Sequence, residues 1–116
     1  MALDPRKAFT ERVKTIDPIF RRGDLRAFWP ALRGLVRLAP DRADLSRKKS
    51  HYLVSLAARS LRRGDLQAAV GFLDYADNRV NPEHLTAYFV EERRRWRQQV
   101  EKTLLAAKTG LKEPKP

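Results

Sequence analysis

The pentapeptide RRGDL occupies residues 21–25 and returns unchanged at residues 62–66. In both copies basic residues precede a glycine and an aspartate follows it. Basic residues stabilise the C-terminus of a helix, glycine adopts the left-handed backbone that ends it, and aspartate caps the next helix. Each copy therefore predicts a tight turn between two antiparallel helices.

The offset of 41 residues extends beyond the pentapeptide. The alanine and leucine at positions 27 and 32 recur as Ala68 and Leu73, and Pro40 recurs one position late as Pro82. Duplication of a helix-turn-helix unit explains this pattern. A good hairpin turn that is used twice explains it as well, and both explanations stay open.

Further capping signals delimit the other helices. Asp4, Asp17 and Asn81 each stand directly before a proline, which suits the first helical position because its missing N–H has no partner there. A break at Pro18 is expected, and Pro30 is expected to kink its helix or delay its start. No segment alternates as a strand does. We predict five helices, near residues 5–21, 25–38, 44–62, 66–79 and 83–108.

These helices predict an all-α fold, with about five helices in a compact bundle built from antiparallel helical hairpins. The chain has 116 residues, enough for one domain with one core. We expect residues 1–110 to form that single helical domain and residues 111–116, LKEPKP, to be a mobile tail. Whether the hairpins stack as a repeat or close as a bundle stays open.

The charge of the chain is strongly positive. It has 25 Lys and Arg against 14 Asp and Glu, a net charge of +11. Such an excess attracts a polyanion, and nucleic acid is the usual one. No apolar run reaches the roughly 20 residues that span a bilayer, so we expect no membrane partner. The opening MALDPRKAF lacks the apolar stretch of a secretory signal, which predicts a cytoplasmic protein.

Several chemistries find no support in the sequence. The chain has no cysteine, no phosphate-binding loop, no HExxH and no G-x-S-x-G, and its two histidines lie in different predicted helices. We therefore expect no enzyme activity, no catalytic residue, no metal and no cofactor. The carboxylates of Asp74, Asp77 and Glu83 leave a magnesium-dependent nuclease open as a third interpretation.

Residues 41–64 hold the largest share of the positive charge, with seven basic and two acidic groups. On the helix predicted there, one polar stripe lies opposite the apolar side, and the only nearby carboxylates are Asp41 and Asp44. A solvated face, or docking on the acidic helix through Asp74 and Asp77, are the alternatives. We predict that this stripe and the adjoining turn bind phosphates through Arg47, Lys48, His51, Arg59, Arg62 and Arg63.

A second basic cluster surrounds Trp96. Glu91 is placed to pair with Arg94 and Arg95 along one helix, which neutralises part of the charge. Trp96 shares an apolar face with Val100 and is expected in the core. Arg94 and Arg97 point away from that face and are further candidates for nucleic-acid contacts.

Trp29 is the candidate for a partner interface. It follows Phe28 directly, and adjacent helical positions cannot both face one core, so one of the two aromatic side chains is expected at the surface. We assign that position to Trp29. Which of the two indoles, Trp29 or Trp96, is exposed stays open.

Two resemblances accompany this interpretation. Residues 53–82 resemble a tetratricopeptide hairpin, with a turn at Gly64 and Asp65 and with Ala69, Leu73 and Ala76 at the family's small-large-small positions. The 41-residue offset departs from the family's period. The segments KKSHYLVSLAARSLRRGDL and LTAYFVEERRRW are similar in texture to small helical subunits of CRISPR effector complexes, which implies a groove-lining, non-catalytic role.

The sequence thus predicts a non-catalytic helical subunit that binds the phosphate backbone of RNA or single-stranded DNA with little sequence specificity. We expect it to work inside a larger ribonucleoprotein or protein assembly, with protein partners or self-association. The alternative is a protein-protein interaction adaptor of the helical-repeat type. The sequence does not specify the oligomeric state.

Overall fold

Helix α1, Pro5–Arg21, begins with the capping arrangement that its sequence predicts. In the computed structural model, which describes residues 4–108, the Asp4 carboxylate accepts a hydrogen bond from the backbone N–H of Arg6 at 3.1 Å, and Pro5 takes the first helical position. The predicted tail at residues 111–116 lies outside the described residues.

Neither internal proline ends or delays its helix. Helix α1 continues through Pro18, so the predicted break is wrong, and helix α2, Leu25–Leu38, starts well before Pro30. Both prolines are exposed, as are Lys14 and Arg26, whose carbonyls lose their helical donor to these prolines. Water can therefore satisfy those carbonyls, which lowers the cost of keeping the helices continuous.

The two copies of RRGDL form the same turn, as predicted. Gly23 and Gly64 both have φ +80°, the left-handed conformation that ends a helix at low cost only for glycine. The Asp24 carboxylate accepts from Ala27 N–H at 3.2 Å, and the Asp65 carboxylate accepts from Ala68 N–H at 3.1 Å. Each aspartate thus caps the helix that follows its turn.

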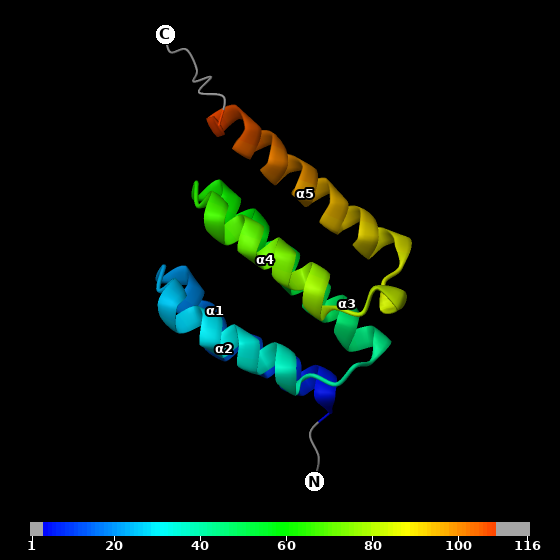
Figure 1. The fold of residues 1–116 in the computed structure, drawn as a ribbon. Helices are drawn as coiled ribbons and strands as arrows, with labels where there is room; N and C mark the ends of the chain where they lie inside the picture. The colour runs from blue at the N-terminus through cyan, green and yellow to red at the C-terminus, as the bar shows by residue number, and fades with distance from the viewer. Residues whose placement is uncertain (1–3, 109–116) are drawn as a thin grey trace. The chain divides into compact units, whose positions relative to one another are not determined.

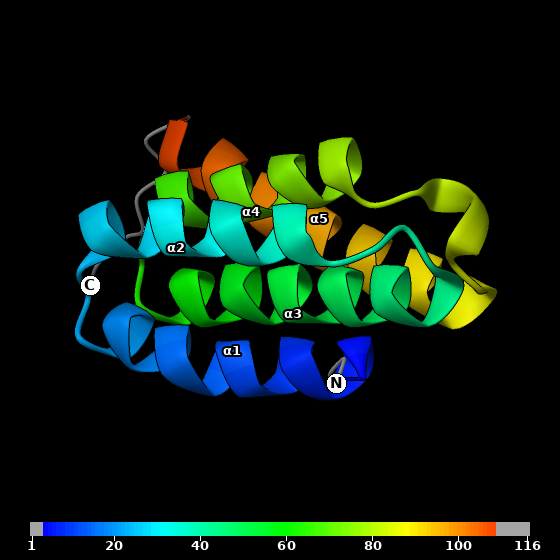
Figure 2. The same ribbon diagram turned by 90° about the horizontal axis from the view of Figure 1, so that it is seen from below.

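The contacts divide the chain into two units, and the boundary between them follows Ser46. In the first unit, α1 and α2 lie side by side as an antiparallel hairpin (Figure 2). The rings of Phe20 and Phe28 pack against each other across the turn, tilted by 56°, with centroids 5.3 Å apart. The buried side of α2 consists of Phe28, Leu32, Leu35 and Val36.

The second unit contains most of α3, Ala43–Arg62, together with α4, Leu66–Arg79, and α5, Ala87–Lys108 (Figure 1). The α4 side of this unit's core includes Ala69, Phe72, Leu73 and Ala76, and Val100 is the buried residue of α5. On α3, Leu45, Leu53, Leu56 and Ala57 are fully buried, and Tyr52 is half-buried.

Helix α5 starts later than the predicted residue 83. Pro82–His84 form one 3-10 turn, η1, in which the Asn81 side chain accepts from Glu83 N–H at 3.0 Å. The α-helical pattern begins only where Val90 N–H bonds to the Thr86 carbonyl. The Asn-Pro signal therefore caps a separate short turn and not the long helix.

The 41-residue offset also appears in the helices that follow the turns. Helices α2 and α4 each have 14 residues, and their first residues are 41 positions apart. Both end in the same way, because Ala39 N–H bonds to Leu35 and Val80 N–H bonds to Ala76. All secondary structure within residues 4–108 is helical, and none of these helices combines the length and apolarity that a bilayer-spanning helix needs.

Candidate nucleic-acid interface

The predicted stripe on α3 is less exposed than its sequence indicates. His51 and Arg62 are exposed, whereas Arg47, Lys48 and Arg59 are half-buried. Burial extends well around this helix and includes polar side chains, namely Ser46, Lys49, Ser50 and Ser60. Lys49 therefore contributes to the charge of this segment without standing on its solvent surface.

Groups that are distant in sequence contact the side chains of this stripe. Nε of Arg47 donates to the carbonyl oxygen of His84 at 3.0 Å. Nδ1 of His51 lies 3.0 Å from Oε2 of Glu92 on α5. The expectation that Asp41 and Asp44 would be the only nearby carboxylates is therefore wrong, because tertiary packing brings an acid 41 positions away to the stripe.

The remaining predicted residues of this region also have partners. The guanidinium carbon of Arg62 lies 5.8 Å from the centroid of the Trp96 ring, within cation-π range. Lys48, Arg59 and Arg63 each take part in an interaction within the protein. A phosphate that binds to these side chains must compete with contacts already made.

The arginines of α5 are divided between local and long-range ion pairs. Nη2 of Arg94 lies 2.7 Å from Oε2 of Glu91, as its spacing predicts. No ion pair joins Glu91 to Arg95 within residues 4–108, so this second predicted pairing is not formed. Arg97 does not point freely into solvent, because it meets two carboxylates of α4.

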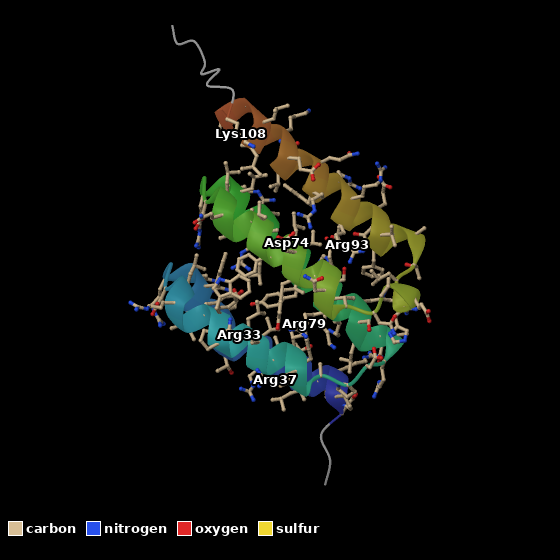
Figure 3. The ribbon with its side chains drawn as sticks, in the orientation of Figure 1. Arg33, Arg37, Asp74, Arg79, Arg93 and Lys108 are labelled. Carbon is tan, nitrogen blue, oxygen red and sulfur yellow. The ribbon has the colours of Figure 1, made fainter. Side chains whose placement is uncertain are left out.

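The acidic side of α4 faces α5. Nε of Arg93 lies 3.2 Å from Oδ1 of Asp77, and Nη2 of Arg97 lies 3.0 Å from Asp74 and 2.6 Å from Asp77. Figure 3 shows Asp74 and Arg93 in the space between the two helices. The acidic helix is therefore paired with the arginines of α5, and the alternative that it holds the α3 stripe has no support in these contacts.

These contacts also raise the pKa of Arg97. Burial lowers its pKa, but hydrogen bonds to Asp77 and Asp74 and their negative charges outweigh burial, so its pKa lies above the ordinary value. The guanidinium is thus held in its charged form between the two carboxylates. Within residues 4–108 no group of three or more His, Asp or Glu side chains is arranged to hold a metal ion.

Helix α2 carries a row of arginines that the sequence reasoning missed. Arg26, Arg33 and Arg37 follow steps of seven and four residues, which places them within about 40° on one side of the helix. All three are exposed, and Arg33 and Arg37 project from α2 in Figure 3. The helix contains no acidic residue between its ends. We call these three residues the α2 arginine row.

The α2 arginine row differs from the basic groups of the α3 stripe in having no internal partner. Within residues 4–108 none of its three guanidinium groups makes a hydrogen bond, an ion pair or a cation-π contact. The sequence signal was available, because residues 25–38 contain three arginines and no carboxylate. It was overlooked because the net charge of that segment is smaller than that of residues 41–64.

The two indoles are placed alike. Phe28 is fully buried and Trp29 is half-buried, so Trp29 is the less buried of the two adjacent aromatic side chains without being fully exposed. Trp96, expected in the core, is also half-buried. Neither indole is as exposed as Tyr88, at 62%.

The first unit also contains an apolar hollow of about 250 Å³ at the open end of its hairpin. Phe9 and Leu35 line its floor, and Leu38 at its edge is 67% exposed. Arg12 is the charged residue in its lining.

Searches with protein-family models, curated proteins and solved structures find no match for this chain.

Proposed function

We propose that the protein binds nucleic acid through the phosphate backbone, as a non-catalytic subunit of a larger assembly. The α2 arginine row is the observation that carries this proposal. Three exposed guanidinium groups without internal partners keep their full capacity for charge-assisted hydrogen bonds to phosphate oxygens. The net charge of +11 adds a long-range attraction for the same ligand.

The spacing of the row suits a repeating anion. Arg26 and Arg37 are eleven residues apart, or about 16 Å along the helix axis at 1.5 Å per residue. Phosphates along one strand of B-form DNA rise by about 3.4 Å each, so the row spans about five of them. The proposal assigns the three arginines to phosphate oxygens, which carry no sequence information, and the row contains no Asn, Gln or Asp. Little sequence preference is therefore expected.

The test is a salt titration of binding to labelled single-stranded DNA, RNA and duplex DNA. Phosphate contacts release counterions, so the logarithm of the association constant falls linearly with the logarithm of salt concentration. Replacing the three residues of the α2 arginine row by glutamine should reduce that slope by about two for a single strand. No measurable binding at low salt would contradict the proposal.

A charge-matched control separates local contacts from net charge. Lys14, Arg21 and Arg94 each pair with a carboxylate three or four residues away on their own helix. Replacing these three by glutamine removes the same formal charge but takes it from side chains already in ion pairs. We expect this variant to keep a steeper salt dependence than the variant of the α2 arginine row.

One observation favours a protein-interaction adaptor as the second candidate. The hollow in the first unit is mainly apolar, and the exposed Leu38 at its edge extends its apolar surface. Exposed apolar surface of this kind occurs at protein-protein interfaces. If Leu38→Asp abolished association with a protein partner, and nucleic acid failed to bind at low salt, the adaptor would be favoured.

A further inference from the structure

The outer face of α5 combines aromatic and cationic side chains. Tyr88, Arg95, Gln99 and Lys102 follow steps of seven, four and three residues, so they lie along one stripe of the helix. All four are exposed. Trp96 lies next to Arg95 in the sequence and flanks this stripe on the side of the core.

A shallow hollow of about 260 Å³ opens beside Trp96. Leu61 of α3 and the indole of Trp96 provide its apolar walls, and Arg95 and Gln99 complete the lining. The guanidinium of Arg62 lies 5.8 Å from the indole centroid and adds a second positive charge nearby. Pockets for drug-sized ligands measure about 300–1,000 Å³, so this one suits a single planar ring system.

The acids on this side of α5 are already engaged. Glu91 pairs with Arg94 at 2.7 Å, and Glu92 lies 3.0 Å from His51. In the part of the chain that the structure describes, Arg95 makes no hydrogen bond or ion pair, and neither does Lys102. The hollow therefore joins an aromatic wall to a cation that is available to an anionic ligand.

We propose that this hollow accepts one unpaired base of a single-stranded nucleic acid. The base lies against Trp96, an adjoining phosphate binds Arg95, and the strand continues along α5 toward Lys102. Stacking on aromatic side chains tolerates any base, because every base has a π face. The inference rests on the proposed function and adds the class of strand, since bases in a duplex are stacked on each other and cannot enter.

The experiment compares two labelled probes by fluorescence anisotropy, with the full chain at one low salt concentration. The probes are a thymidine homo-oligomer and an abasic oligomer of equal length and charge. The protein should bind the base-bearing probe about tenfold more tightly. Trp96→Leu should remove that ratio, Trp96→Phe should retain most of it, and Arg95→Gln should weaken both probes. A uridine homo-oligomer repeats the comparison for RNA.

Trp29→Leu is the matched control, because it removes the other half-buried indole and should keep the ratio. Equal affinity of the wild type for both probes would overturn the inference while leaving backbone binding intact. A ratio lost with Trp29→Leu and kept with Trp96→Leu would also overturn it. Failure of every probe to bind would instead contradict the proposed function.

A second measurement does not depend on the folding of a Trp96 variant. In Trp29→Phe the sole remaining indole is Trp96. Its fluorescence should be quenched by the thymidine probe and change little with the abasic probe at equal saturation. Equal quenching by both probes would overturn the stacking contact.

Discussion

Nη2 of Arg97 donates to Oδ2 of Asp77 at 2.6 Å, and the same nitrogen lies 3.0 Å from Oδ1 of Asp74. One side chain of α5 therefore joins two carboxylates that lie one turn apart on α4. Arg97 is 24% exposed, whereas the two aspartates are more exposed than that. The contact is a structural link between two helices at the edge of their interface.

Arg97→Gln should therefore change stability more than nucleic-acid binding. The free energy of unfolding should fall by only about 1 kcal/mol, because the two carboxylates are partly exposed and solvent weakens their attraction to Arg97. Urea denaturation measures this loss. Arg33→Gln is the matched control, and it should leave the unfolding curve nearly unchanged while weakening oligonucleotide binding. The reverse pattern would show that Arg97 is the phosphate contact, as its sequence position first indicated.

The helices could be predicted because their limits are encoded locally. Both glycine turns and the caps at Asp24 and Asp65 depend on residues within a few positions of each other, and the structure has them as predicted. The limit at residue 83 was wrong because a 3-10 turn and an α-helix share the Asn-Pro start signal. Helix α1 continues through Pro18 where Pro18 and Lys14 are exposed to solvent, and the local sequence does not show that exposure.

The distribution of free charge could not be predicted in the same way. Counting charges along the chain identifies α3 as the basic helix. It cannot show that Glu92 pairs with His51 or that Asp77 pairs with Arg97, because each pair joins two different helices. Those pairs depend on which helices pack together. The α2 arginine row could have been predicted from helical periodicity alone, because that helix contains no carboxylate that could pair with its arginines.

Acid should remove one contribution to stability at the start of α3. The pKa of Asp44 lies below its ordinary value, chiefly because Arg42 donates to its carboxylate, with Nη2 at 2.7 Å from Oδ2. A carboxyl group with a lowered folded-state pKa stabilises the fold above its unfolded pKa, about 3.9 for Asp. This contribution disappears as the pH falls through the folded-state pKa.

Asp44→Asn should thus lower the melting temperature near neutral pH. At strongly acid pH the melting temperatures of the variant and the wild type should lie closer together. Melting curves recorded by circular dichroism between neutral and acid pH provide the comparison. The result opposing this assignment is a difference between the two proteins that stays constant, or grows, as the pH falls.

The adjacent aromatic residues of α2 should respond very differently to truncation. Phe28 is fully buried and its ring lies 5.3 Å from that of Phe20, so Phe28→Ala should cost about 3–5 kcal/mol. Trp29 is half-buried, and Trp29→Ala should cost clearly less. Urea denaturation of the two variants gives the comparison. Equal losses would place Trp29 in the core and remove it as a candidate partner contact.

Alanine substitutions at the three described glycines outside α4 should change the free energy of unfolding in opposite directions. Gly23 and Gly64 have φ +80°, and a Cβ at either position would meet no atom within 4 Å beyond the adjacent residues, so the cost of alanine there is conformational. Gly23→Ala and Gly64→Ala should each lower the free energy of unfolding by about 1–2 kcal/mol. Gly34 lies inside α2 with equally open space, and Gly34→Ala should raise it by about 0.5–1 kcal/mol. Urea denaturation of the three variants decides the signs, and a stabilising Gly64→Ala would contradict the left-handed turn.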